Sequence, residues 1–181
     1  MQIRSDERIR LDVLTNPYGP SEMVWDAIAS NSPSRTSTEA LEADLRRRLG
    51  AFVGVPEGWV VLANGIDELH AMITRWRSEQ GPVLTFPPTD PQLDAWVEAH
   101  GAQVEHIPRL NGFRVPVRTG MEDIPRGSTA VVMSPNDPSG TIITAQDTVR
   151  LLRRSAVVVV DERHAAYSPR SVLPLAREWE N

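Results

Sequence analysis

Asp161 is the residue whose position in this sequence best suits chemistry. It directly follows four consecutive valines, Val157–Val160, which predict a buried strand. A carboxylate at the end of such a strand needs a strong partner, because burying an unpaired charge is costly. Two interpretations stay open. Asp161 is either a helix cap or half of a buried ion pair, or it binds the protonated nitrogen of an aromatic ring.

Two further loops follow predicted strands and carry polar residues. Asn64–Glu68 contains a glycine and leads into a predicted helix, whose free backbone N–H groups favour an anion. A structural turn capped by Asp67 explains the same residues equally well. Ser134–Gly140 contains two prolines and a glycine, which fix an irregular path and hold Asn136 and Asp137 rigidly. An ordinary tight turn is the alternative for this second loop.

These residues need a scaffold, and strands alternate with helices from residue 59 onward. Short apolar runs predict strands, and apolar residues at helical spacing predict helices. The expected strands are 59–63, 83–86, 104–107, 129–133 and 156–160, and the expected helices are 67–78, 91–100, 145–153 and 171–179. A helix over 21–30 and another that opens at Thr38 precede them. The pattern predicts an α/β fold, with three α/β/α layers around a mostly parallel sheet. Ligands of such sheets sit beyond the carboxyl ends of the strands.

Composition narrows the class of function. A length of 181 residues fits one large domain or a piece of a larger one, and the net charge of −5 argues against nucleic acid as a partner. No apolar run approaches the roughly 20 residues of a membrane span. The sequence has no cysteine, and its four histidines lack metal-ligand spacing, so no metal site is expected. The charged first residues do not resemble a signal peptide, so the cytoplasm is the expected location.

Five stretches resemble, in family order, the fold-type-I pyridoxal phosphate-dependent aminotransferases (class I/II), and most closely the histidinol-phosphate aminotransferase branch. They are Asn16–Pro20, Ala63–Leu69, Pro87–Thr89, Ser134–Gly140 and Val159–Glu162. The resemblance spans nearly the whole chain. It implies pyridoxal phosphate as the cofactor and amino-group transfer between an amino acid or amino-alcohol phosphate and a 2-oxo acid. It also implies an N-terminal arm over 1–20 and an incomplete large domain over 21–181.

The resemblance assigns roles by position. Tyr18 matches the arm residue that reaches the substrate, a small-molecule amino donor. The backbone of Gly65, Ile66 and Asp67 matches the place where the cofactor phosphate is held at a helix start. Asp161 matches the carboxylate that pairs with the pyridine nitrogen and keeps it charged, so that the ring can accept electrons from the substrate.

Four positions near the implied ring depart from the family pattern. Ile66 stands where the family has a small residue, and its branched side chain would crowd the phosphate. Asp90 stands where an aromatic residue stacks on the ring. Asp137 replaces an asparagine that donates to the 3′ oxygen, and an ionised aspartate only accepts hydrogen bonds. His164 replaces a tyrosine and retains the ability to donate.

The sequence contains no lysine, since all 19 residues counted as Lys plus Arg are arginine. The family holds its cofactor through a lysine, and the resemblance places that lysine beyond Asn181. No catalytic residue is therefore assigned. We expect an incomplete family member that is inactive alone and binds the cofactor weakly. The alternatives are one half of a split enzyme and a non-catalytic binding or dimerisation module. We expect a homodimer, or association with a complementary or full-length relative, because an incomplete sheet exposes an edge.

Overall fold

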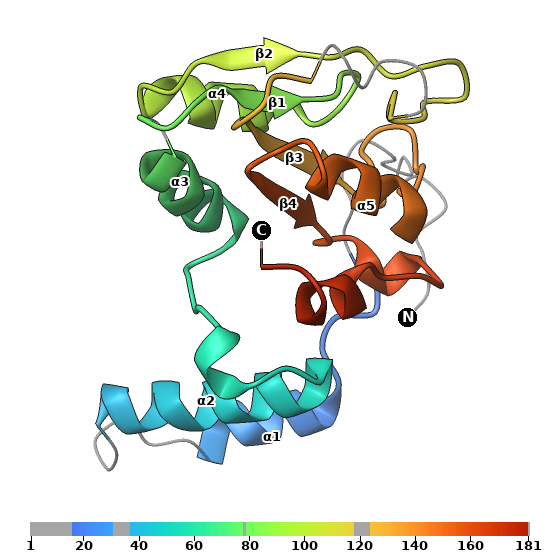
Figure 1. Ribbon diagram of the computed structural model, residues 1–181. Coiled ribbons are helices and arrows are strands. Elements are labelled where there is room, and N and C mark those ends of the chain that lie inside the picture. The colour runs from blue at the N-terminus through green and yellow to red at the C-terminus, as the bar shows by residue number, and fades with distance from the viewer. Residues whose placement is uncertain (1–15, 31–36, 78, 118–123, 181) are drawn as a thin grey trace, which may run out of the picture. The chain divides into compact units, whose positions relative to one another are not determined.

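The computed structural model describes residues 16–30, 37–77, 79–117 and 124–180. The chain divides into two compact units, Met1–Gly58 and Trp59–Asn181, which we describe separately (Figure 1). Only residues 16–20 of the expected arm are among the described residues, so the division at residue 20 stays a prediction.

The described residues of the first unit form two α-helices, α1 (Glu22–Ser30) and α2 (Thr38–Val53). Helix α2 begins where its residue types predict, because the Ser37 hydroxyl caps it by accepting the N–H of Ala40 at 3.3 Å. It ends at Val53 and is capped by Gly54, whose φ of 76° is the left-handed conformation that glycine adopts readily. Helix α1 buries none of its residues within the described structure.

The described residues of the second unit form a four-stranded sheet. The strands are β1 (Val83–Thr85), β2 (Val104–His106), β3 (Thr129–Met133) and β4 (Val157–Asp161). Their order is β2-β1-β3-β4, and every neighbouring pair is parallel. The helices of this unit are α3 (Ile66–Arg77), α4 (Pro91–Ala99) and α5 (Ala145–Leu152). The α/β class with a parallel sheet is therefore confirmed.

Side chains alternate across the sheet, and each face has its own core. Leu84 and Val132 pack on one face in a cluster that includes Leu151 of α5. Val83 and Val131 point to the other face and pack with residues of α4. Successive side chains of a strand point to opposite faces of the sheet, so neighbouring residues belong to different cores. Figure 1 shows α4 and α5 on opposite faces of the sheet, which gives the three expected layers.

Two predicted elements are wrong. The expected strand over 59–63 is absent. Trp59 ends the 3-10 helix η2 (Glu57–Trp59), and no described strand pairs with residues 60–63, so an extended segment there would have no ladder of hydrogen bonds. The expected helix over 171–179 is the short 3-10 helix η5 (Leu173–Arg177). Pro174 lies in its first turn and supplies no backbone N–H. Helices α3, α4 and α5 agree with prediction to within one residue at each end.

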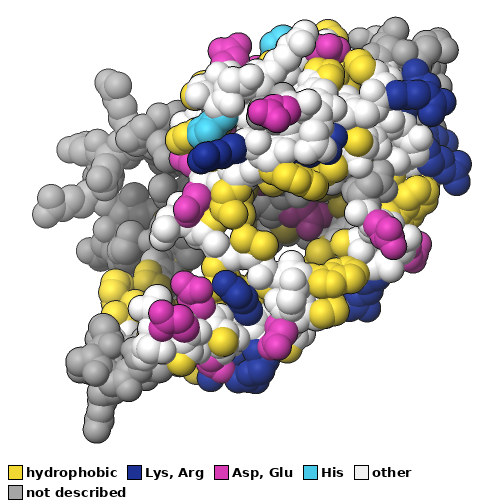
Figure 2. All heavy atoms as spheres, turned by 60° about the vertical axis from the view of Figure 1, so that its left-hand side comes forward, with side chains coloured by type: hydrophobic (Ala, Val, Ile, Leu, Met, Phe, Trp, Pro, Cys, Tyr) yellow, Lys and Arg dark blue, Asp and Glu magenta, His cyan; other side chains and the backbone are white. Residues whose placement is uncertain are grey.

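No helix within the described ranges combines the length and apolarity needed to cross a bilayer. On the face drawn in Figure 2, acidic, basic and apolar side chains are interspersed.

Candidate functional site

The loops after β1, β3 and β4 meet at one edge of the sheet, because the strands are parallel and their carboxyl ends lie together. In the register of β3 and β4, Met133 lies opposite Asp161. The N–H of Ser134 then donates to the backbone oxygen of Asp161 at 2.9 Å. The loop Ser134–Gly140 therefore starts directly beside Asp161.

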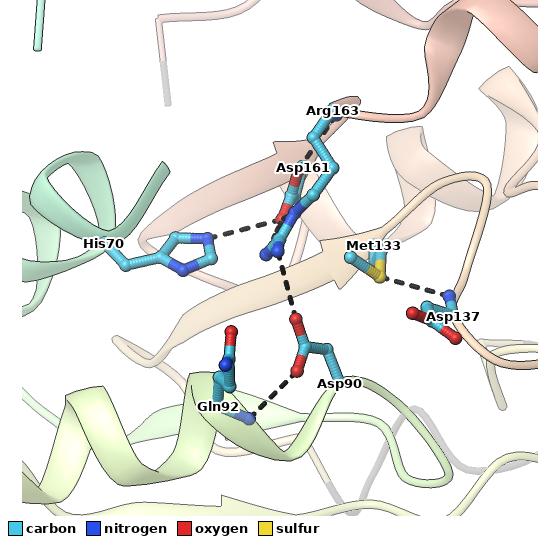
Figure 3. A network of polar contacts seen from close by, with 7 residues as sticks. All are labelled: His70, Asp90, Gln92, Met133, Asp137, Asp161 and Arg163. Carbon is cyan, nitrogen blue, oxygen red and sulfur yellow. Dashed lines mark hydrogen bonds and ion pairs between the residues drawn. The ribbon is translucent and has the colours of Figure 1, made fainter. Parts of the chain in front are cut away.

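The carboxylate of Asp161 is buried and bound to Arg163. Its Oδ2 accepts from Arg163 Nε at 2.8 Å and lies 2.6 Å from Nη2, while Oδ1 accepts from the backbone N–H of Arg163 at 3.0 Å. The Asp161 side chain is 3% exposed and that of Arg163 is 21% exposed. Figure 3 shows the guanidinium of Arg163 against this carboxylate. The buried ion pair that the sequence left open as an explanation is present.

His70 of α3 approaches the same carboxylate from another side (Figure 3). Its Nε2 lies 3.5 Å from Asp161 Oδ2, and the histidine side chain is only 4% exposed. This nitrogen forms no hydrogen bond with any residue that the structure describes. It is a buried polar atom next to the candidate site, aimed at its carboxylate.

Asp161 stays ionised despite its burial. Burial alone would raise the pKa of the carboxyl group, but His70 and the side chain, backbone N–H and charge of Arg163 hold that pKa well below its ordinary value. The site therefore contains a fixed negative charge at neutral pH. Such a charge stabilises a cation at its edge.

Asp90 contributes a second carboxylate from the loop after β1. Its Oδ1 caps α4 by accepting the N–H of Gln92 at 3.0 Å, and its Oδ2 accepts from Arg163 Nη1 at 3.0 Å. Partial burial alone would lower the pKa of Arg163. The hydrogen bond and charge of Asp161, with the charges of Asp90 and Asp67, raise it instead. Arg163 thus links the loops after β1 and β4.

Asn136 and Arg109 hold the loops after β1 and β3 together. The buried Asn136 donates through Nδ2 to the Pro88 carbonyl at 3.0 Å and to Ser139 Oγ at 2.8 Å. Its Oδ1 accepts from Arg109 Nη2 at 2.6 Å, and Arg109 Nε donates to the Phe86 carbonyl at 2.8 Å. Burial lowers the pKa of Arg109 to about 10, so it is still charged at neutral pH.

The other predicted residues take varied positions. The Asp137 side chain is exposed, while its backbone N–H points to Met133 Sδ at 3.1 Å. Gly65 is exposed with a φ of 88°, and a Cβ built on it would meet no atom within 4 Å. His164 is partly buried and precedes the 3-10 helix Ala165–Tyr167. Tyr18 belongs to the first unit and is 91% exposed.

A backbone N–H at the start of α3, where the sequence predicts an anion site, is already bound to a side chain of this helix. Ile66, partly buried, is the first residue of this helix, and Asp67 is exposed in its first turn. The backbone N–H of Asn64 already donates to the carboxylate of Glu68. A carboxylate in the first turn that accepts a backbone N–H just before the helix is typical of helix caps.

The sequence matches the family model described as "Aminotransferase class I and II" over residues 7–178. This chain belongs to the class I and II aminotransferase family. Among its curated relatives, histidinol-phosphate aminotransferase 1 of Trichormus variabilis is 29% identical, with 98% of this chain and 51% of the relative covered. Histidinol-phosphate aminotransferase of Roseiflexus castenholzii is 30% identical over 92% of this chain and 47% of the relative.

Solved structures have the same fold. Histidinol-phosphate aminotransferase from Sinorhizobium meliloti, in complex with pyridoxal-5'-phosphate, superposes with a TM-score of 0.72 and 21% identity over 86% of this chain and 44% of that chain. A decarboxylase from Sulfurospirillum multivorans gives a TM-score of 0.68 and 23% identity over 93% of this chain and 50% of that chain. This chain spans about half the length of the curated relatives it matches.

The described residues fit the ring nitrogen of pyridoxal phosphate. Asp161 supplies a buried, ionised acceptor, and the planar, protonated guanidinium of Arg163 shows that this acceptor binds a flat cation. The open space beside Gly65 fits a close ligand approach at the start of α3. Asp137 does not fit a donor role toward the 3′ oxygen, because its carboxylate only accepts.

Sequence reasoning missed three residues of this site: His70, Arg109 and Arg163. No pattern in the sequence placed His70 in the site, and the 3.5 Å between its Nε2 and Asp161 Oδ2 brings it there. Arg163 had a usable signal, since it is the first cationic side chain after a buried carboxylate that needs a partner. Arg109 had none, because it lies 27 positions from the asparagine that it binds.

Proposed function

We propose that this chain forms the part of a pyridoxal phosphate-dependent aminotransferase that binds the pyridine nitrogen of the cofactor. The observation that carries the proposal is the buried carboxylate of Asp161, ionised at the carboxyl end of β4 in a chain of this family. The whole protein would transfer an amino group between a small-molecule amino donor, an amino acid or amino-alcohol phosphate, and a 2-oxo acid. We propose the cytoplasm as its compartment.

The site residues of this chain would bind the cofactor and the substrate. Bound pyridoxal phosphate supplies a ring that accepts electrons from the substrate. The ionised carboxylate of Asp161 would hold a proton on the ring nitrogen, and the neighbouring His70 adds a polar group behind it. The backbone of Gly65–Asp67 would hold the phosphate at the start of α3. Tyr18 would contact the substrate.

The covalent step would need a group from outside these residues, because none of the 181 is lysine. The chain spans about half the length of its relatives, so the remaining half of such a protein, or a second polypeptide, is the proposed source of that lysine. On this account these residues bind and orient the cofactor, and they do not transfer an amino group alone.

We propose association as well. Within the described residues, β4 pairs on one side only, with β3. An exposed strand edge favours pairing with another chain. The expected assembly is a homodimer or a complex with a complementary or full-length relative.

A second candidate is a non-catalytic dimerisation module, and a specific observation favours it. Arg163 already satisfies the Asp161 carboxylate. Copurification of a lysine-bearing partner with transaminase activity would support the split enzyme. A stable, colourless, self-associated protein that ignores pyridoxal phosphate would support the module.

The proposal is tested by calorimetric titration of pyridoxal phosphate into the complete natural protein that carries this sequence, which we call the full-length protein. Asp161→Asn should weaken binding by about 10-fold or more, because a charged hydrogen bond to the ring is lost. Asp44→Asn is the matched control, since Asp44 also pairs with two arginines but lies exposed on α2. Equal affinity in wild type and Asp161→Asn would refute the assignment.

A further inference from the structure

The guanidinium of Arg163 lies where a cationic ligand of Asp161 would bind. We propose that Arg163 is an internal competitor of the cofactor: its side chain must leave Asp161 and Asp90 before a protonated ring nitrogen can bind. The inference rests on the proposed function. It gives Arg163 a role in setting the affinity of the site for the cofactor. The proposed chemistry itself does not require Arg163.

The guanidinium of Arg163 covers one oxygen of the Asp161 carboxylate, Oδ2. Arg163 Nε and Nη2 both lie within 2.8 Å of Asp161 Oδ2. On its other side, Oδ2 faces the ring of His70 at 3.5 Å. Oδ1 is bound to a backbone N–H. While Arg163 is in place, its two nitrogens beside Oδ2 keep a ring N–H away from this oxygen, because two cations cannot approach it from the same side.

Asp90 holds the competitor in position. Arg163 Nη1 lies 3.0 Å from Asp90 Oδ2, and this carboxylate is fixed because its other oxygen caps α4. One guanidinium thus bridges the carboxylate at the end of β4 and the carboxylate in the loop after β1, as the dashed contacts of Figure 3 show. Both contacts are charge-assisted, which makes them stronger than neutral hydrogen bonds. Asp90 therefore stabilises the position in which Arg163 is bound to Asp161, although Asp90 is not itself the proposed partner of the ring nitrogen.

Arg163 can withdraw without unfolding its surroundings. Its side chain is 21% exposed, compared with 3% for that of Asp161, so part of the Arg163 side chain already borders solvent. Its backbone N–H bonds to Asp161 Oδ1 independently of the side chain. The exchange of one planar cation for another leaves the buried carboxylate paired in both states.

Competition lowers the apparent affinity of the site. When only a fraction of the molecules has the site open, the apparent dissociation constant increases by the inverse of that fraction. Removing the guanidinium should therefore tighten cofactor binding by about 10- to 100-fold, the range that corresponds to loss of one or two charged hydrogen bonds from the competing state. Removing the Asp90 contact alone should tighten it by a smaller factor.

The test measures the dissociation constant of pyridoxal phosphate by calorimetry in the full-length protein and its variants. The variants are Arg163→Ala, Asp90→Asn, and Asp161→Asn combined with Arg163→Ala. Arg150→Ala is the matched control, because Arg150 is partly buried in an ion pair with Asp147 on α5. Any lysine elsewhere in the protein is common to all variants, so the ratios report on this site alone.

The expected order of affinity is Arg163→Ala tightest, then Asp90→Asn, then wild type and Arg150→Ala together, with the double variant weakest. If Arg163→Ala does not fold, Asp90→Asn still has to bind more tightly than wild type. Equal binding by wild type, Arg163→Ala and Asp90→Asn would overturn the competition and leave the proposed function standing. Equal binding by Arg163→Ala and the double variant would overturn the role of Asp161. No binding by any variant would overturn both.

Discussion

Replacing Asp161 with asparagine tests whether its ion pair stabilises the fold. The change removes one charge and keeps the size of the side chain. It leaves the guanidinium of Arg163 facing an amide where it had a carboxylate at 2.6 Å and 2.8 Å. Asparagine also presents two N–H donors, which can face the donors of Arg163 unfavourably.

The expected cost follows from the burial of the pair. Removing one partner of a fully buried ion pair costs about 3–5 kcal/mol. Arg163 is 21% exposed and keeps its contact with Asp90 at 3.0 Å, which reduces the penalty. We expect Asp161→Asn to lower the free energy of unfolding by about 2–3 kcal/mol at pH 7.

The pH dependence gives the sharper test. The pKa of Asp161 is depressed in the folded state, so its ionised form contributes stability that is complete above the unfolded pKa of about 3.9. That stability is lost as the pH falls from there through the folded pKa. Asparagine does not titrate, so the difference between wild type and variant should shrink below about pH 4.

Urea unfolding at pH 7 and pH 3 measures both effects, and an unchanged dependence on urea concentration shows that the unfolded states are comparable. Asp44→Asn is the control, because its carboxylate is exposed and its replacement should change stability little. A variant as stable as wild type at pH 7, or a difference that stays constant between the two pH values, would refute the reasoning.

Three further outcomes are expected. Arg109→Ala should lower the free energy of unfolding, measured with urea, by about 3 kcal/mol, because it leaves the Asn136 and Phe86 oxygens unpaired. Arg170→Ala, at an exposed arginine, is the control and should be as stable as wild type. An Arg109→Ala variant as stable as this control would contradict the role of Arg109 in holding the loops. Asp137→Asn should tighten calorimetric binding of pyridoxal phosphate to the full-length protein by about 10-fold or less, since an amide can donate to the 3′ oxygen; weaker binding would count against that position. The 181 residues produced alone should form no borohydride-reducible side-chain adduct with the cofactor, because they contain no lysine, and a modified side chain in mass spectrometric peptide mapping would contradict this.

The fold was largely predictable because local patterns agree with long-range packing. Residues 129–133 were predicted as a strand, and the structure gives β3 the same bounds. Continuous apolar runs suit a strand that is covered on both faces, and β3 is buried throughout. Residues 59–63 have a similar composition and form no strand, because sequence alone does not show whether a pairing partner exists.

The site was predictable only where its residues lie at the ends of elements. Asp161 was found because four valines precede it, and its burial agrees with that argument. Arg163, which links Asp161 to Asp90, lies 73 positions from Asp90 in the sequence, and no local pattern predicts a contact between positions so far apart. Side chains as long as arginine can reach in many directions, so their partners follow from the folded backbone.

The most direct test of the central claim is the ¹⁵N NMR shift of ring-labelled pyridoxal phosphate bound to the full-length protein. We predict the shift of a protonated ring nitrogen at neutral pH in wild type and in Arg163→Ala. Asp161→Asn should move it to the shift of an unprotonated nitrogen, because the carboxylate that holds the proton is gone. An unprotonated nitrogen in wild type, or an identical shift in wild type and Asp161→Asn, would contradict the claim that Asp161 binds the ring.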